Sequence, residues 1–130
     1  MDTAAAHPVR VMLAEDSDII RDRLVEMLRE AAHVDLVGIA CDAPEAMALF
    51  HAVRPEAIIL DIQMPGGNGV DVLQTIRHSD RTCTVIMLTS YNSDYLRQRC
   101  LDRGADFFLD KATEFEQVLD VLGEMARRHP

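Results

Sequence analysis

The chain has 130 residues, which suffice for one domain with a substantial core, and its 48% hydrophobic and 27% charged residues are typical of globular proteins. The net charge of -9 argues against nucleic acid as the main partner, because phosphate binding needs a basic patch. Neither a membrane-spanning apolar run nor a signal-peptide pattern is present in the sequence, so we expect a cytoplasmic protein without a membrane partner.

Five short apolar runs are expected to be β-strands. They lack a clean alternation of apolar and polar residues, which is the pattern of strands that are buried on both faces of a parallel sheet. In chain order the expected strands are residues 9–14, 34–39, 57–60, 84–88 and 106–109.

The segments that follow the strands repeat their apolar residues at helical spacing. Ser17 can cap the first helix, Pro44 suits the first turn of the second, and Gly104 is a natural end for the fourth. The expected helices are residues 18–31, 43–53, 69–78, 93–104 and, from Thr113 or Glu114 onward, up to 126. Strands that alternate with helices predict an α/β fold with a mostly parallel sheet covered on both faces.

The domain organisation is expected to be simple. Residues 1–8 are predicted to be a loose tail and residues 9–127 a single domain, with no output domain after it.

Polar side chains follow four of the five expected strands, at the points where the strands end. They are Glu15 and Asp16 after the first strand, Asp61 after the third, Thr89 after the fourth and Lys111 after the fifth. In a doubly wound sheet, functional groups gather beyond the carboxyl ends of the strands. Three carboxylates, a hydroxyl and an ammonium group are therefore expected to meet at one edge of the sheet.

This set of groups suits phosphoryl transfer to a carboxylate. Three close carboxylates repel one another, and their oxygen atoms suit Mg²⁺ as a compensating cation. An ionised carboxylate can act as a nucleophile, while Lys111 and Thr89 can neutralise phosphoryl oxygens. Taken singly, an acidic residue at a strand end is often only a helix cap, and a lone lysine is often only exposed. The joint placement of all five groups favours a functional site.

Four segments resemble the motifs of the response-regulator receiver domain, a family of two-component signalling proteins. In the most specific of them, an apolar strand leads into Asp61, followed by Met64, Pro65 and Gly69. The acidic pair, the Thr89–Ser90 strand end and the segment 104–111 are similar to the other three motifs. The resemblance covers about residues 9–126, and it implies a flavodoxin-like doubly wound parallel sheet of five strands in the order 2-1-3-4-5 with five flanking helices.

The resemblance also implies a role for each site residue. Asp61 would be the phosphoacceptor, and Mg²⁺ would be bound directly by Asp16, Asp61 and the backbone carbonyl of Gln63, with Glu15 acting through a water molecule. Thr89 and Lys111 would contact the phosphoryl group. Phe108 would be the aromatic switch residue, which turns inward when Thr89 moves toward the phosphoryl group.

The partners implied by the resemblance are proteins. A sensor histidine kinase or a histidine phosphotransfer protein would donate the phosphoryl group. A downstream protein would bind the face formed by the fourth helix, fifth strand and fifth helix, and a phosphorylation-dependent dimer is a further expectation. The chain would not be an enzyme beyond catalysing its own phosphorylation and dephosphorylation, and no direct contact with nucleic acid is expected.

One position departs from the family pattern. Ala112 stands where family members often have a proline with a cis peptide bond, and a non-proline cis bond costs about 3 kcal/mol, so the turn after Lys111 is expected to differ.

Three alternatives to a stand-alone receiver are open. We favour a stand-alone receiver over one excised from a longer DNA-binding response regulator. A Mg²⁺-dependent aspartyl-phosphate phosphatase is disfavoured because Gln63 occupies the position of its second aspartate, and a degenerate scaffold is disfavoured by the full set of site residues.

Overall fold

The fold is seen in a computed structural model, which describes residues 7–91 and 93–128. Most of the expected N-terminal tail lies outside the described residues. Among the described residues, no helix combines the length and the apolar character needed to cross a bilayer.

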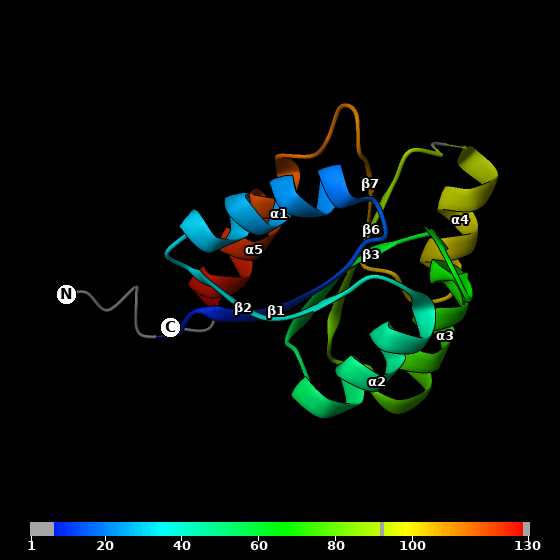
Figure 1. Cartoon of the computed structure of the whole chain (residues 1–130), viewed down its shortest axis with the longest axis horizontal. Coiled ribbons are helices and arrows are strands. Elements are labelled where there is room, and N and C mark those ends of the chain that lie inside the picture. The colour runs from blue at the N-terminus through cyan, green and yellow to red at the C-terminus, as the bar shows by residue number, and fades with distance from the viewer. Residues whose placement is uncertain (1–6, 92, 129–130) are drawn as a thin grey trace.

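A parallel sheet forms the centre of the molecule (Figure 1). Its strands lie in the order β2-β1-β3-β6-β7, so the predicted order 2-1-3-4-5 is confirmed. The strands are β1 (Val9–Ala14), β2 (Val34–Ala40), β3 (Ala57–Asp61), β6 (Thr84–Thr89) and β7 (Phe107–Asp110).

Helices cover both faces of this sheet (Figure 1). The buried side chains of α1 and α5 pack in one cluster with one face of β1, β3, β6 and β7. Those of α2, α3 and α4 pack in a second cluster on the opposite face. The helices are α1 (Asp18–Glu30), α2 (Ala43–Val53), α3 (Gly69–Ser79), α4 (Asp94–Asp102) and α5 (Gln117–Arg128).

The segment between β7 and α5 differs from the sequence-based expectation. The fifth helix begins at Gln117, later than the expected start at Thr113 or Glu114. The carboxylate of Asp110 accepts hydrogen bonds from the backbone N–H groups of Ala112 (2.7 Å) and Thr113 (3.2 Å). The next residues are joined by three-residue turns, in which the backbone N–H groups of Gln117 and Leu119 donate to the carbonyls of Glu114 and Glu116, so the regular helix begins only after them. The peptide bonds among the described residues are all trans, so this turn is closed by Asp110 without a cis bond.

A short hairpin after β3 was not expected from the sequence, because two-residue strands have no periodicity to detect. Its strands are β4 (Gln63–Met64) and β5 (Gly67–Asn68), which pair in antiparallel fashion. The hairpin leads into Gly69, where a Cβ atom would lie 2.1 Å from the backbone oxygen of Asp61. Only glycine therefore lets α3 begin this close to the end of β3.

Candidate functional site

Three carboxylates meet at the carboxyl edge of the sheet, as the sequence predicts. Glu15 and Asp16 follow β1, and Asp61 ends β3, the neighbouring strand. One carboxylate oxygen from each residue lies within 4.8 Å of the others. Glu15 and Asp61 are buried, with 1% and 5% of their surface exposed, whereas Asp16 is exposed. Asp16 is therefore the member of the cluster that is most open to a ligand from solvent.

Lys111 supplies the positive charge of the cluster. Its Nζ atom lies 2.9 Å from Oε1 of Glu15 and 3.3 Å from Oδ1 of Asp61. The backbone N–H of Lys111 donates to the carbonyl of Thr89 (2.9 Å), which fixes the lysine beyond the end of β7. One ammonium group accompanies a cluster of three carboxylates, so the cluster keeps an excess of negative charge.

This excess changes the protonation of Asp61. Burial and the nearby negative charge of Glu15 raise the pKa of Asp61 from 3.8 to about 7, although Lys111 partly offsets the rise. A further cation is needed to keep all three carboxylates ionised near neutral pH. The donor set consists of oxygen atoms alone, which fits Mg²⁺ better than the softer transition metals.

Arg21 holds the backbone of the acidic pair and was not identified from the sequence. Its guanidinium donates to the carbonyls of Glu15 (3.1 Å) and Asp16 (3.3 Å) and pairs with Asp18 (2.5 Å). The only sequence signal for this role is the position of an arginine in the first turn of the helix that follows the pair. Ser17 also donates its backbone N–H to Oε2 of Glu15 (3.1 Å), so the acidic loop is fixed on both sides.

Gln63 and Thr89 lie on either side of Asp61. The backbone N–H of Gln63 donates to Oδ1 of Asp61 (3.3 Å). Thr89 is fully buried and follows Leu88, the residue that pairs with Asp61 across β3 and β6. The Thr89 hydroxyl oxygen accepts a hydrogen bond from the backbone N–H of Tyr91 (2.9 Å), which ties it to the loop before α4.

Phe108 already faces inward in this structure, with 4% of its surface exposed. It packs in the cluster that includes Met87 and Cys100, beneath α4. Arg97 of α4 covers it: the guanidinium carbon lies 6.0 Å from the ring centre, and Nη1 donates to the Phe108 carbonyl (3.3 Å). The ring is thus already turned inward in this conformation, and the expected coupling of its rotamer to Thr89 on phosphorylation stays a prediction.

Comparison with known families gives the class of the protein. The family described as the response regulator receiver domain matches residues 11–123, which span the sheet edge with all the site residues above. The chain belongs to this family, and its flavodoxin-like fold agrees with the assignment.

Individual relatives come from bacterial regulators. The chain is 36% identical over 121 residues to the transcriptional regulatory protein PdtaR of Mycobacterium tuberculosis, a match that covers 93% of this chain and 58% of PdtaR. It spans about half the length of the curated relatives it matches.

Solved structures show the same fold. The receiver domain of the response regulator NarL from M. tuberculosis has a TM-score of 0.85 and 26% identity, covering 93% of this chain and 98% of that one. A CheX–CheY–BeF3–Mg²⁺ complex from Borrelia burgdorferi matches with a TM-score of 0.79 and 25% identity, covering 93% and 95%.

Proposed function

We propose that Asp61 accepts a phosphoryl group from a phosphohistidine of a sensor kinase or phosphotransfer protein. The observation that carries this proposal is the position of Asp61: a buried carboxylate, 3.3 Å from an ammonium group and within 4.8 Å of two further carboxylates. A carboxylate in this setting has a cation partner for the incoming phosphoryl oxygens and acceptors for a metal ion.

Asp16, Asp61 and the Gln63 carbonyl would hold Mg²⁺, with Glu15 acting through water. The ion would supply the charge neutralisation that the cluster lacks. The likeness to a CheY that was crystallised with BeF3 and Mg²⁺ supports this part of the proposal. Lys111 would move part of its interaction from Glu15 to a phosphoryl oxygen, and Thr89 would donate its hydroxyl proton to another, because its present hydrogen bond uses it only as an acceptor.

The signal would pass to a protein partner through the face formed by α4, β7 and α5. Thr89 and Phe108 support this part of the proposal, because Thr89 begins the loop to α4 and Phe108 lies under α4. In this function the chain would catalyse only its own phosphorylation and dephosphorylation, in the cytoplasm.

Two forms of the protein are compatible with this function. They are a stand-alone receiver, which we favour, and the receiver of a longer regulator. PdtaR, a transcriptional regulatory protein, is longer than this chain, and this supports the second alternative. An antibody to this chain would decide between them. A band near 14.5 kDa in extracts of the source organism would support the stand-alone form, and a band of twice that mass the longer one.

The phosphoacceptor is tested by incubating the protein with acetyl phosphate and Mg²⁺ and measuring its intact mass. We expect one added phosphoryl group in the wild type and none in Asp61→Asn or without Mg²⁺. Asp35→Asn, which changes an exposed carboxylate on β2, is the matched control and should be labelled normally. Full labelling of Asp61→Asn would contradict the proposal.

A further inference from the structure

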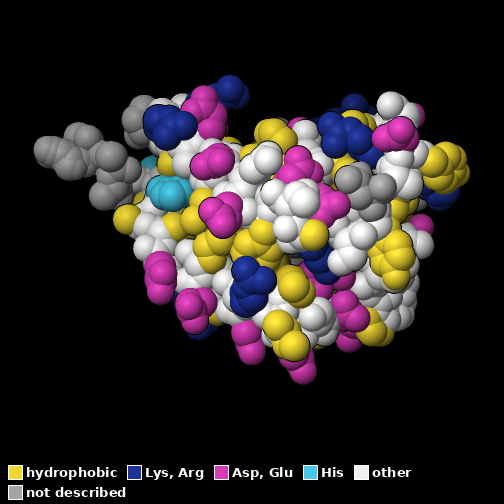
Figure 2. All heavy atoms as spheres, turned by 90° about the horizontal axis from the view of Figure 1, so that it is seen from above, with side chains coloured by type: hydrophobic (Ala, Val, Ile, Leu, Met, Phe, Trp, Pro, Cys, Tyr) yellow, Lys and Arg dark blue, Asp and Glu magenta, His cyan; other side chains and the backbone are white. Residues whose placement is uncertain are grey.

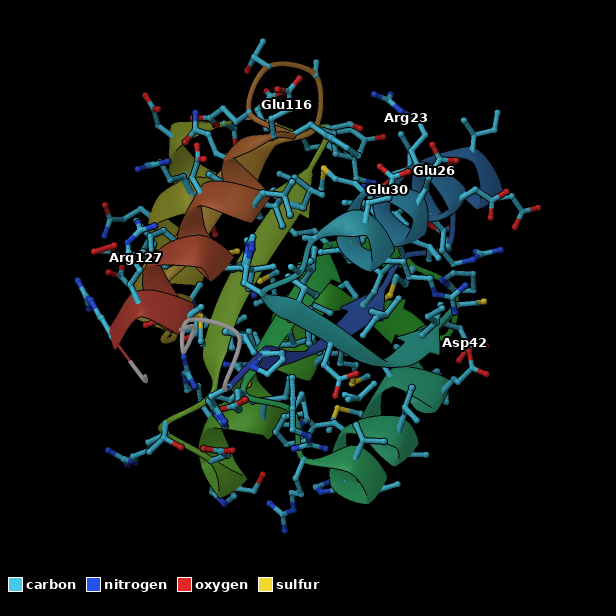
Figure 3. All side chains as sticks on the ribbon, turned by 90° about the vertical axis from the view of Figure 1, so that its left-hand side faces the viewer. Arg23, Glu26, Glu30, Asp42, Glu116 and Arg127 are labelled. Atoms are coloured by element: carbon cyan, nitrogen blue, oxygen red, sulfur yellow. The ribbon has the colours of Figure 1, made fainter. Side chains whose placement is uncertain are left out.

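The loop between β7 and α5 carries Lys111 and projects from the body of the molecule. It rises beyond the ends of α1 and α5, and Figure 3 labels Glu116 where the loop returns toward α5 (Figures 1 and 3). Ala112 and Thr113 are exposed, and residues 111–117 line one side of a cavity of about 600 Å³. Packing against the rest of the protein therefore does little to hold the loop that places this lysine.

The sheet anchors Lys111 on one side only. Its backbone N–H donates to the carbonyl of Thr89 (2.9 Å), but β7 ends at Asp110, and the chain turns away directly after the lysine. The direction of a side chain depends on the backbone on both sides of it, and the four-carbon stem of a lysine is costly to order. A second anchor is therefore needed to keep the Nζ atom 2.9 Å from Glu15 and 3.3 Å from Asp61.

Asp110 and Glu114 close the turn around Lys111 from both ends. The Oδ1 atom of Asp110 accepts hydrogen bonds from the backbone N–H groups of Ala112 (2.7 Å) and Thr113 (3.2 Å). The Oε1 atom of Glu114 accepts one from the backbone N–H of Asp110 (2.9 Å), and the N–H of Glu114 donates to the carbonyl of Asp110 (2.8 Å). Lys111 lies inside the turn that these four hydrogen bonds close, which we call the Asp110–Glu114 clamp.

The two carboxylates of the clamp bind backbone rather than cations. None of the ion pairs among the described residues involves Asp110 or Glu114, although basic side chains lie among acidic ones on the side of the molecule seen in Figure 2. A carboxylate next to Lys111 in the sequence could draw the ammonium group away from Asp61. Because Asp110 is engaged by two backbone N–H groups, it does not compete for that ammonium group.

We propose that Asp110 and Glu114 are positioning residues for phosphoryl transfer, which hold the ammonium group of Lys111 in place before the phosphoryl group arrives. A cation that is ordered in advance needs no further ordering when the phosphoryl oxygens reach it. This role rests on the proposed function, since the clamp serves transfer only if Asp61 is the phosphoacceptor. The clamp uses Asp110 and Glu114 as hydrogen-bond acceptors and not as charges, so amide side chains should serve equally well.

Paired variants of the full chain separate acceptor from charge. Asp110→Ala and Asp110→Asn remove the same charge, but only the asparagine keeps an Oδ1 acceptor. Glu114→Ala and Glu114→Gln break or keep the clamp from its other end, and they replace the first pair if Asp110→Ala does not fold. Asp80→Ala is the matched control, because Oδ1 of Asp80 also accepts two backbone N–H groups, from Thr82 (2.8 Å) and Cys83 (3.1 Å), at the opposite edge of the sheet.

The first measurement follows the lysine itself. Lys111 is the only lysine of the chain, so labelling with ¹³C,¹⁵N-lysine gives one set of side-chain NMR signals. In the two alanine variants of the clamp, the order parameter of the Lys111 Cε methylene should fall and its shifts should move toward those of free lysine. The amide variants and Asp80→Ala should keep the wild-type signals.

The second measurement follows the phosphoryl site. In the presence of Mg²⁺, the affinity for beryllofluoride, a phosphoryl mimic, should fall by about tenfold in the alanine variants of the clamp and by less than about twofold in the amide variants and Asp80→Ala. The affinity for Mg²⁺ alone should not fall in any of them, because Lys111 competes with the ion for oxygens of Asp61. General damage to the site would weaken both ligands.

The outcomes separate this role from the proposed function. A wild type that does not bind beryllofluoride would contradict the proposed function, while the Lys111 signals would still show whether the clamp orders the lysine. If the wild type binds the mimic, equal affinity in the alanine variants would overturn the positioning role. A loss in Asp110→Asn as large as that in Asp110→Ala would also overturn it, since charge and not the acceptor would then be the cause.

Discussion

Charged side chains are paired at the amino edge of the sheet and are left unbalanced at the carboxyl edge. At the amino edge, the guanidinium of Arg77 donates to the carbonyls of Gly104 (2.8 Å) and Cys83 (2.6 Å) and to the carboxylate of Asp106 (2.7 Å). At the carboxyl edge, Lys111 pairs with two of three clustered carboxylates, and the pKa of Asp61 is raised to about 7. The amino edge is thus a fully paired network that stabilises the fold. The carboxyl edge keeps an unbalanced charge that costs stability and suits an incoming cation.

The largest effect should come from breaking the paired edge. Arg77→Ala should lower the free energy of unfolding by about 3 kcal/mol, because it leaves the partly buried carbonyls of Cys83, just before β6, and Gly104, just after α4, without this donor. Urea denaturation of the unphosphorylated protein measures this. Arg81→Ala removes an exposed arginine four residues later and should change stability by less than about 0.5 kcal/mol. If both variants changed the free energy of unfolding by the same small amount, the network around Arg77 would not be what stabilises the amino edge.

Removing the charge of Asp61 at the carboxyl edge should raise the free energy of unfolding, whereas Arg77→Ala should lower it. Because the pKa of Asp61 is raised in the folded state, its contribution to stability is present below pH 3.8 and is lost as the pH rises through about 7. Asp61→Asn has no proton to lose, so it should be more stable than the wild type at pH 8, by about 2 kcal/mol. The difference should shrink below pH 7.

The same measurements distinguish charge repulsion from a packing effect. Mg²⁺ should raise the stability of the wild type at pH 8 and leave Asp61→Asn nearly unchanged, since a bound cation relieves the repulsion. Thermal unfolding with and without Mg²⁺ gives both numbers. A stability gain in Asp61→Asn that is constant from pH 4 to pH 8 would show that charge is not its cause.

Removing one carboxylate at a time should show that the acidic residues are not equivalent. Asp16 is exposed and carries no ion pair among the described residues, whereas Glu15 is held by Lys111. Asp16→Ala should weaken Mg²⁺ binding by about tenfold, and Glu15→Ala by less. Titration calorimetry at pH 8 tests this order. Equal Mg²⁺ affinity in the wild type and Asp16→Ala would remove Asp16 from the set of metal ligands.

Much of this site could be predicted because it depends on short-range patterns. Each strand of the parallel sheet is visible as an apolar run, and the parallel order places Glu15, Asp61 and Lys111 at one edge. The parts that the sequence did not reveal depend on single long side chains reaching backbone atoms. Arg21 and Arg77 bind carbonyls of other segments, and nothing in the pattern around them specifies which carbonyls.

The later start of α5 shows the same limit in another form. Residues from Thr113 onward have helical spacing of apolar positions, and this pattern led to the early boundary. In the structure Asp110 closes a separate turn through the N–H groups of Ala112 and Thr113, and three-residue turns follow before the regular helix. Apolar periodicity does not distinguish such turns from a regular helix, so it places the boundary too early.

The smallest effect should be on the link between the unbalanced edge and α4. Thr89 is held by Tyr91 in the loop before α4, and Arg97 of α4 covers Phe108. A phosphoryl group on Asp61 adds acceptors for the Thr89 hydroxyl, and the resulting shift is a change of populations worth about 1–3 kcal/mol. Thr89→Ala should leave Asp61 able to accept a phosphoryl group but weaken the response of α4. Arg97→Ala should loosen α4 even before phosphorylation, because it removes the contact to the Phe108 carbonyl and ring.

Amide chemical shifts with and without beryllofluoride, a phosphoryl mimic, separate these steps. In the wild type we expect shifts at residues 93–110 as well as at the site. In Thr89→Ala only the site residues should respond, and in Arg97→Ala the signals of residues 94–102 should move toward their activated positions before the mimic is added. Thr113→Ala, at an exposed position in the turn beyond β7, is the control and should respond as the wild type does. An undiminished response of α4 in Thr89→Ala would mean that the charge at the carboxyl edge reaches α4 by a route that does not include this hydroxyl.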